Sequence, residues 1–347
     1  MKAIFLIIKI KTGGGIMRTR GLLFFLGCMF FVSGALATTA AGAEKKQIRI
    51  GTWGTADASY FLAGAISRIL NAKVAEVNSV VIPASTMKDT LGFENGTISI
   101  GWTQSEALHF APIEEAGGPF KKGEIYKKGR VLLYLAPSPM HAVVLDKSKI
   151  KKITDINKDT RIAVFSPSSL STAQIPLRYH GVKDGQYKLQ YLGKAAQCAA
   201  LKDGNIDVMF QSGNLPMTAV QQIAREVKIR ILHWDPERIK KAVRENPNFV
   251  SRVIPKDLYG KGTPDRDILS MGTLITLGAS ADLDEKTVYD IMKAMLENVK
   301  DITAVHPDGK LFTAENTQYW INNLGQQFPF HPGAKKYLME KGVKFRD

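Results

Sequence analysis

Residues 47–70 read QIRIGTWGTADASYFLAGAISRIL, and this stretch contains the pattern that decides the fold. Residues 47–52 alternate polar and apolar side chains, which is typical of a strand with one buried face. A turn rich in glycine and threonine follows, and residues 60–70 then place apolar side chains at helical spacing. The sequence therefore predicts a strand, a polar turn and a helix in immediate succession.

The same succession recurs along the chain. Further strands are expected over 77–82 and 98–103, with a short helix over 87–94 between them. The second half is predicted to repeat this order, with strands over 161–165, 187–192 and 206–210 and with helices through 178 and over 195–201. Alternating strands and helices of this kind indicate parallel sheets flanked by helices, which is the α/β class.

Two crossings between the halves divide the chain into two lobes. Strands over 131–135 and 141–145, on either side of Pro137-Ser138-Pro139, are predicted to form the first crossing, and a strand over 271–277 forms the second. Lobe I is then residues 44–140 plus 272–347, and lobe II is residues 141–271. A strongly amphipathic helix is expected over 285–299, in the returning part of lobe I.

Residues 1–43 are predicted to be a secretory signal peptide. Arg18 and Arg20 form its basic end, residues 22–32 its apolar stretch, and the small residues before Glu44 its cleavage site. Cleavage after Ala43 is preferred to the similar pattern at 35–37. A second methionine, Met17, would by itself begin a complete signal, so translation is expected to start there. The mature protein is therefore predicted to be periplasmic.

The composition is that of an ordinary globular protein, with 45% hydrophobic and 23% charged residues. Without residues 1–43 the chain has 42 basic and 32 acidic residues, a net charge of +10, which favours anionic partners. The basic residues are scattered and do not alternate with aromatic residues, so no nucleic-acid partner is expected. Cys198 would be the one cysteine of the mature chain, and we expect it to pack as a small apolar side chain.

The loops that follow the predicted strands are rich in glycine, hydroxyl and amide residues. Ligands of open α/β sheets lie beyond the carboxyl ends of the strands, where backbone N–H groups at helix N-termini can hold an anion. Helix capping uses the same residue types and remains an alternative for each loop. The candidate ligand-binding residues are Thr52, Trp53, Thr55, Asp57, Ser59, Tyr60, Ser85, Thr86, Thr103, Gln104, Phe165, Ser166, Ser168, Ser169, Ser171, Ser212, Gly213, Asn214 and Pro216.

The sequence contains no recognisable catalytic or metal-binding pattern. None of its six histidines has a metal-ligand spacing to another histidine or to a cysteine. The glycine-flanked serine of hydrolases and the phosphate-binding loop of nucleotide enzymes are both absent from the sequence. We therefore expect a protein that is not an enzyme, with no catalytic residue, no metal and no cofactor.

From residue 48 to residue 337 the chain resembles the TAXI-type solute receptors of tripartite ATP-independent periplasmic (TRAP) transporters. The resemblance rests on the opening strand, turn and helix and on four later segments: Trp102-Thr103-Gln104-Ser105, Asp203 to Val208, Ser212 to Pro216, and Phe330-His331-Pro332-Gly333-Ala334-Lys335-Lys336-Tyr337. It implies a two-lobed periplasmic binding protein fold, type II-like, with a ligand cleft between the lobes. It also implies a monomer that delivers an amino acid or an organic acid, such as glutamate or a dicarboxylate, to integral membrane permease subunits.

Two rival interpretations remain beside the TRAP receptor. The same fold could serve an ABC-type importer or a sensor kinase, and less readily a periplasmic enzyme. The first turn departs from the family, because Ala56-Asp57 replaces a Gly-Gly pair and Ser59 replaces an aromatic residue. Asp57 either pairs with an ammonium group of the solute or caps the helix that follows. His331 either touches the solute or a membrane subunit, or forms a turn that fixes the C-terminal helix.

Overall fold

The computed structural model describes residues 44–53, 55, 57–110, 126–165, 169–246, 248–326 and 328–345. The predicted signal peptide over 1–43 lies outside the described residues, as do two of the predicted site residues, Ser166 and Ser168.

The first sheet begins with three parallel strands in the order β2-β1-β3. They are β1 (Lys46–Thr52), β2 (Val77–Pro83) and β3 (Ile100–Gln104). The helices α1 (Ala58–Lys73), α2 (Thr86–Asn95) and α3 (Ser105–Phe110) follow these strands in turn. The strand–turn–helix succession predicted for residues 47–70 is confirmed.

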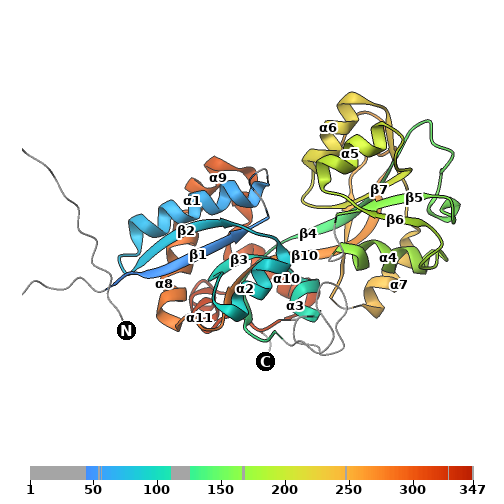
Figure 1. The fold of residues 1–347 in the computed structure, drawn as a ribbon. Helices are drawn as coiled ribbons and strands as arrows, with labels where there is room; N and C mark the ends of the chain where they lie inside the picture. The colour runs from blue at the N-terminus through green and yellow to red at the C-terminus, as the bar shows by residue number, and fades with distance from the viewer. Residues whose placement is uncertain are drawn as a thin grey trace, which may run out of the picture. The chain divides into compact units, whose positions relative to one another are not determined.

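Two long antiparallel strands continue this sheet into a second set of strands. They are β4 (Gly129–Leu145) and β10 (Ile268–Ser280), which lie next to each other and are visible in Figure 1 between the two groups of helices. The prediction of two separate strands around Pro137 and Pro139 is wrong, because β4 is continuous. Proline has no backbone N–H. Pro137 and Pro139 are two residues apart and direct their backbone groups to the same edge of β4, so both missing N–H groups lie on that edge, and Ser138 between them keeps its N–H.

Gly272 allows β4 and β10 to approach closely at this crossing. A Cβ atom at Gly272 would lie 2.1 Å from the carbonyl oxygen of Ser138, a distance that no side chain tolerates. Gly272 is paired with Pro139, so the glycine and the two prolines of β4 occupy the same part of the ladder.

Beyond the crossing, the order of strands is β4-β7-β5-β6, with the last three parallel. These strands are β5 (Arg161–Val164), β6 (Lys188–Tyr191) and β7 (Val208–Ser212), and the short strands β8 (Ile229–Ile231) and β9 (Val250–Ile254) pair with β4 and β10. The helices of this part are η1 (Ile153–Asp155), α4 (Leu170–Tyr179), α5 (Lys194–Lys202), α6 (Thr218–Glu226) and α7 (Pro236–Glu245).

The chain after β10 returns to the first sheet. It forms α8 (Glu285–Glu297), α9 (Val299–Val305), η3 (Pro307–Leu311), α10 (Ala314–Leu324) and α11 (Pro332–Glu340). The predicted helix over 285–299 is therefore shorter than expected, since Asn298 separates α8 from α9.

The buried apolar side chains form two clusters. The first cluster combines residues 48–135 with Val250 and residues 274–343, and the second cluster takes its members from residues 140–271. The predicted α/β class, with parallel strands flanked by helices, is confirmed.

Candidate functional site

The turn after β1 is held by its own side chains. Oδ1 of Asp57 accepts a 2.9 Å hydrogen bond from the backbone N–H of Ser59 and caps α1. The hydroxyl of Ser59 in turn accepts a 3.0 Å bond from the backbone N–H of Trp53, whose indole N–H donates to the carbonyl of Trp102. The capping role that was the alternative for Asp57 is thus present, and it engages one of the two carboxylate oxygens.

The turns after β2 and β3 also combine caps with polar side chains. The hydroxyl of Ser85 accepts a 3.3 Å bond from the backbone N–H of Lys88 and caps α2. Thr103 is buried, and its hydroxyl lies 3.1 Å from that of Thr90. We call the turns after β1, β2 and β3 the first loop set. Its other predicted residues differ in burial: Thr52 is buried, Tyr60, Thr86 and Gln104 are partly buried, and Thr55 is exposed.

A second loop set follows β5, β6 and β7. Ser169 is the N-terminal cap residue of α4, and the hydroxyl of Ser171 is buried without a hydrogen-bond partner among the residues described. The predicted residues of this set again differ in burial: Gly213 is buried, Ser212 and Asn214 are partly buried, and Phe165 and Pro216 are exposed.

Two polar contacts join the elements that carry the two loop sets. Oδ2 of Asp57 lies 4.0 Å from Nζ of Lys194, the first residue of α5. The hydroxyl of Thr172 in α4 donates to Oε2 of Glu106 in α3 at 3.2 Å. On the second loop set, Nδ2 of Asn214 also donates at 2.6 Å to Oδ2 of Asp308, a residue of η3, which extends the contact region beyond the predicted loops.

Four of these contacting residues are absent from the sequence prediction. Glu106 lies directly after the predicted loop residues Thr103 and Gln104, so its position was a usable signal. Thr172 likewise follows Ser171. Lys194 and Asp308 reach the region only through the tertiary fold, and no local pattern marks them.

Glu106 is a buried acid of this region with a strongly shifted pKa. Its side chain is 3% exposed, and Oε1 has no hydrogen-bond partner in the described part of the chain. Burial raises the pKa of Glu106 to about 8, and the hydrogen bond from Thr172 opposes this rise only in part. The Glu106 carboxyl is therefore mostly protonated at neutral pH and can donate as well as accept a hydrogen bond.

Two of the residues singled out from the sequence have structural roles. Nδ1 of His331 accepts a 3.2 Å bond from the N–H of Gly333, and Nε2 donates at 2.9 Å to the carbonyl of Leu283. His331 thus caps α11 and ties it to the segment before α8. The indole of Trp102 is buried in the first cluster, with its ring edge-on to Phe312.

Cys198 is half-buried, and its thiol lies 3.8 Å from the sulfur of Met209. Burial raises the pKa of the Cys198 thiol, which disfavours the reactive thiolate.

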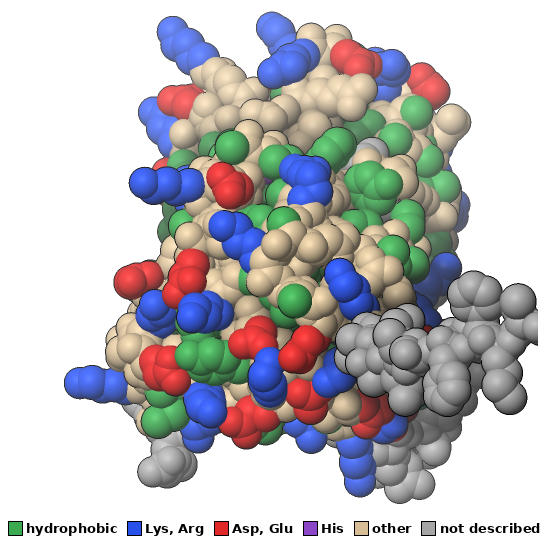
Figure 2. Space-filling model, turned by 90° about the vertical axis from the view of Figure 1, so that its left-hand side faces the viewer, with side chains coloured by type: hydrophobic (Ala, Val, Ile, Leu, Met, Phe, Trp, Pro, Cys, Tyr) green, Lys and Arg blue, Asp and Glu red, His purple; other side chains and the backbone are tan. Residues whose placement is uncertain are grey.

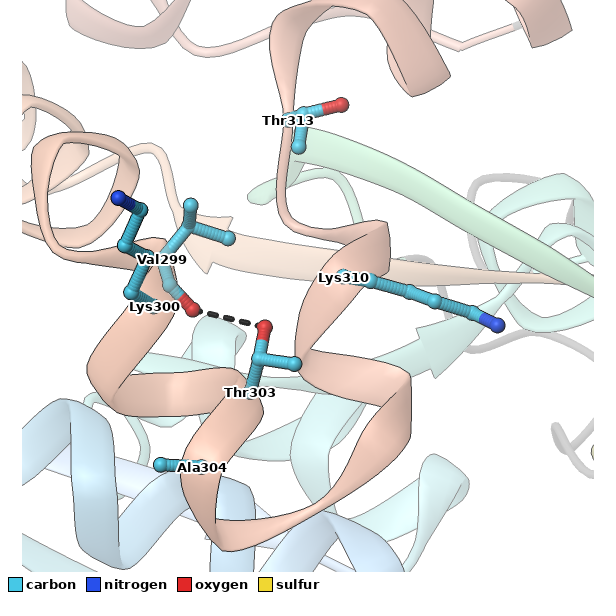
Figure 3. A pocket seen from close by; sticks show the side chains of 6 residues that line it. All are labelled: Val299, Lys300, Thr303, Ala304, Lys310 and Thr313. Carbon is cyan, nitrogen blue, oxygen red and sulfur yellow. Dashed lines mark hydrogen bonds between the residues drawn. The ribbon is translucent and has the colours of Figure 1, made fainter.

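A pocket of about 520 Å³ lies between α9 and η3, and none of its lining residues belongs to either loop set. Figure 3 shows that Lys300 and Lys310 at its border point in different directions. The hydroxyl of Thr303 is engaged by the carbonyl of Val299 at 2.8 Å. The two ammonium groups therefore do not converge on one position, and the pocket is not a built anion site.

The surface charge, the placement of possible metal ligands and the lengths of the helices add three observations. On the face shown in Figure 2, Lys and Arg side chains are dispersed and interspersed with Asp and Glu. Within the described ranges, no group of three or more His, Cys, Asp or Glu side chains is placed to hold a metal ion. Nor is any helix in these ranges long and apolar enough to cross a membrane.

Taken together, the fold and these contacts define an α/β protein in which polar loops from two sets of parallel strands meet. Residues 50–342 match the NMT1-like family, and the chain belongs to that family.

Solved structures with a similar chain course share little sequence with this protein. The periplasmic aliphatic sulphonate binding protein SsuA from Escherichia coli is 15% identical, with 85% of this chain and 79% of that chain covered and a TM-score of 0.47. The alkanesulfonate-binding protein SsuA from Xanthomonas axonopodis pv. citri, solved with MOPS bound, is 16% identical over 86% and 84% of the two chains, with a TM-score of 0.43. A protein from Bordetella bronchiseptica RB50 is 15% identical over 86% and 99%, with a TM-score of 0.49.

Proposed function

We propose that this protein is an extracytoplasmic solute-binding protein that captures a small polar or anionic solute between the two loop sets. The observation that carries this proposal is the pair of contacts Asp57–Lys194 and Glu106–Thr172, which bring the carboxyl ends of both groups of parallel strands together. Ligands of open α/β sheets bind at such strand ends. The residues in contact there offer charged groups and hydroxyls, and no nucleophile–base pair.

Capture would proceed by closure of two lobes, residues 44–140 plus 272–347 and residues 141–271. The hinge would lie where β4 and β10 cross, near residues 136–141 and 270–272. A few residues at such a crossing can absorb the rotation while the packed lobes move as units. The two apolar clusters support this division, because their members change from the first to the second between Leu135 and Met140, with Val250 as the exception.

The charged pair suggests an α-amino acid as the solute. Asp57 and Lys194 come from different loop sets, their side chains are 27% and 36% exposed, and their charged atoms are 4.0 Å apart. At 4.0 Å the pair leaves no room for a solute, so the two lobes would have to open and separate these groups before a zwitterion could insert between them. Its ammonium group would bind the carboxylate of Asp57, and its carboxylate would bind Lys194. A dicarboxylate without an amino group has no cation that could pair with the carboxylate of Asp57.

Calorimetric titration with L-glutamate, L-alanine and succinate tests this assignment. We expect the amino acids to bind and succinate to bind at least tenfold more weakly, because a buried charge without its partner costs several kcal/mol. Asp57→Asn keeps an oxygen for the α1 cap and removes the charge, and should weaken amino-acid binding by a similar factor. Asp159→Asn, at a 75% exposed side chain, is the matched control.

Delivery to TRAP-type permease subunits rests on the resemblance of residues 48–337 to TAXI receptors. Proteoliposomes that contain the permease encoded beside this gene, with the binding protein outside, would distinguish the transporter types. Uptake driven by an ion gradient supports the TRAP assignment, whereas uptake that needs ATP inside the vesicles supports an ABC importer. Solute recovered chemically unaltered after incubation excludes an enzyme that acts on it.

A further inference from the structure

A second pocket lies beside the crossing strands, and it has lining residues other than those of the two loop sets. Its volume is about 630 Å³, within the range of sites for small organic ligands. It is lined by residues 135–137 of β4, 251–253 of β9, and parts of α7, η3 and α10. Helix α10 packs on the first cluster through Ile321, and α7 packs on the second through Ala242, so the pocket borders elements of both clusters.

Arg252 is the one cation among the residues that line this pocket. Its Nη1 donates a 3.0 Å hydrogen bond to the carbonyl of Pro137, and no acid in the described ranges forms an ion pair with it within 4.0 Å. A guanidinium has five N–H donors, so most of its capacity is unused by the described partners. Burial lowers the pKa of Arg252, while the charge of Asp308 opposes this effect, and the group remains a cation.

Two other polar groups of the wall, the amide of Asn316 and the indole of Trp320, are engaged by backbone carbonyls. Nδ2 of Asn316 lies within 3.0 Å of the carbonyl oxygens of Leu135 and Leu311, and the indole N–H of Trp320 donates to Leu135 at 3.0 Å. Tyr319 stands edge-on to Trp320, with ring centroids 4.8 Å apart, and is 55% exposed. The wall opposite Arg252 thus offers aromatic and aliphatic surface with few free donors.

We propose that this pocket binds a small organic monocarboxylate, whose carboxylate pairs with Arg252 and whose apolar body lies against Tyr319 and Trp320. One guanidinium balances one negative charge and matches the two oxygens of a carboxylate. A phosphate or another dianion would need a second cation, which the lining residues do not supply. None of the pocket's lining residues belongs to either loop set, although Ala136 and Pro137 also lie in the proposed hinge.

Fluorine NMR with 4-fluorobenzoate as the probe tests this proposal. We expect the probe signal to broaden and shift in a saturable way at millimolar concentrations. The uncharged analogue 4-fluorobenzyl alcohol should not respond, since it has no carboxylate for Arg252. No saturable response to 4-fluorobenzoate, or an equal response to the alcohol, would overturn the assignment.

Variants locate the bound probe. Arg252→Gln should weaken probe binding by about tenfold or more, because a charge-assisted pair is lost. The affinity of Arg252→Lys for the probe should lie between those of Arg252→Gln and the parent protein, because the charge is kept but the fork geometry is lost. Tyr319→Ser, at an exposed side chain that the fold does not need, should weaken binding several-fold. Lys194→Gln in the second loop set should leave probe binding unchanged. If Lys194→Gln abolishes binding and the pocket variants do not, the probe binds between the loop sets and the proposal is wrong.

Discussion

Thr172 and Glu106 form a buried hydrogen bond between helices that belong to different apolar clusters. The hydroxyl of Thr172 donates at 3.2 Å to Oε2 of a side chain that is 66 residues away in the sequence. Leu108 of α3 packs in the first cluster and Ala173 of α4 packs in the second. The bond therefore links α3 to α4 directly, and its loss affects helices of both apolar clusters.

Thr172→Val should destabilise the protein by about 1–3 kcal/mol, because a buried oxygen of Glu106 loses its donor while the shape of the side chain is kept. Urea unfolding at pH 7 measures this. Thr218→Val at the exposed start of α6 is the control and should change stability by about 0.5 kcal/mol or less. Equal stability of the two variants would show that the Thr172 bond is not formed in solution.

Asp89→Asn should remove a loss of stability at high pH. Asp89 is fully buried on α2, neither carboxyl oxygen has a hydrogen-bond partner in the described residues, and a Cβ at Gly51 would lie only 1.8 Å from Oδ1. Burial raises the pKa of Asp89 from 3.8 to about 9. The unfolded chain therefore releases this proton first, and the stability present below pH 3.8 declines as the pH rises towards 9.

The slope of this decline has an upper limit of about 1.4 kcal/mol per pH unit, the value for a single proton. Thermal melts of the parent protein and of Asp89→Asn between pH 5 and 9 should therefore diverge with rising pH, with the variant the more stable at the alkaline end. Asp159→Asn should follow the parent protein throughout. Parallel curves for the parent and Asp89→Asn would contradict the prediction.

His141 should make the protein sensitive to acid. Its ring is fully buried in β4, Nδ1 donates to the carbonyl of Pro139 at 3.1 Å, and Nε2 accepts a 2.8 Å bond from the hydroxyl of Tyr259. Burial lowers the pKa of His141 from 6.5 to about 4. Below pH 6.5 the unfolded chain binds a proton that the folded chain does not, so stability falls as the pH drops from 6.5 towards 4.

His141→Gln should flatten this acid limb, and denaturant unfolding at pH 4.5, 5.5 and 6.5 measures it. The variant is expected to be less stable at pH 6.5, since it disturbs the bonds to Pro139 and Tyr259, but to lose less on acidification. Tyr259→Phe tests the same network from the other side. A variant that loses stability as steeply as the parent would assign the acid sensitivity to other groups.

His331→Ala should cost about 1–2 kcal/mol of stability, because it removes the cap of α11 and the bond to the carbonyl of Leu283. His331→Asn, which can still cap the helix, should recover part of this loss. Met339→Ala, at a side chain of α11 that is 56% exposed, is the control. Chemical unfolding at pH 8, where the ring is neutral, is the measurement. A negligible effect of His331→Ala would mean that other contacts fix α11.

Local periodicity was sufficient to predict the strands and the helices next to them. Residues 60–70 predicted a helix, and the structure extends it to Ala58–Lys73 because Asp57 caps its start. The same signals were present but overlooked at α7, where Asp235 caps the helix and Pro236 occupies its first position. Pro137 and Pro139 predict a break that β4 does not have, because partners on the neighbouring strands decide whether such a stretch stays paired.

The candidate site was predicted only in part. The loops could be chosen from the sequence, because strand ends are visible in it. The pairing of Asp57 with Lys194 could not, since it depends on how two sets of strands are brought together by β4 and β10. Trp102 shows the converse, because this aromatic residue directly precedes the polar residues Thr103 and Gln104 in the sequence and lies in the core.

The crossing strands also determine the order in which the two cores can form during synthesis. The second cluster takes all its members from residues 140–271, so a continuous piece of chain can complete it. The first cluster begins at Ile48 but needs Tyr337, Leu338 and Val343. Because domains fold as units when their chain is available, the part that is made first must wait for the C-terminus. The early strands β1 to β3 therefore stay unpacked longest, and during this time they are accessible to chaperones and proteases and can pair with one another.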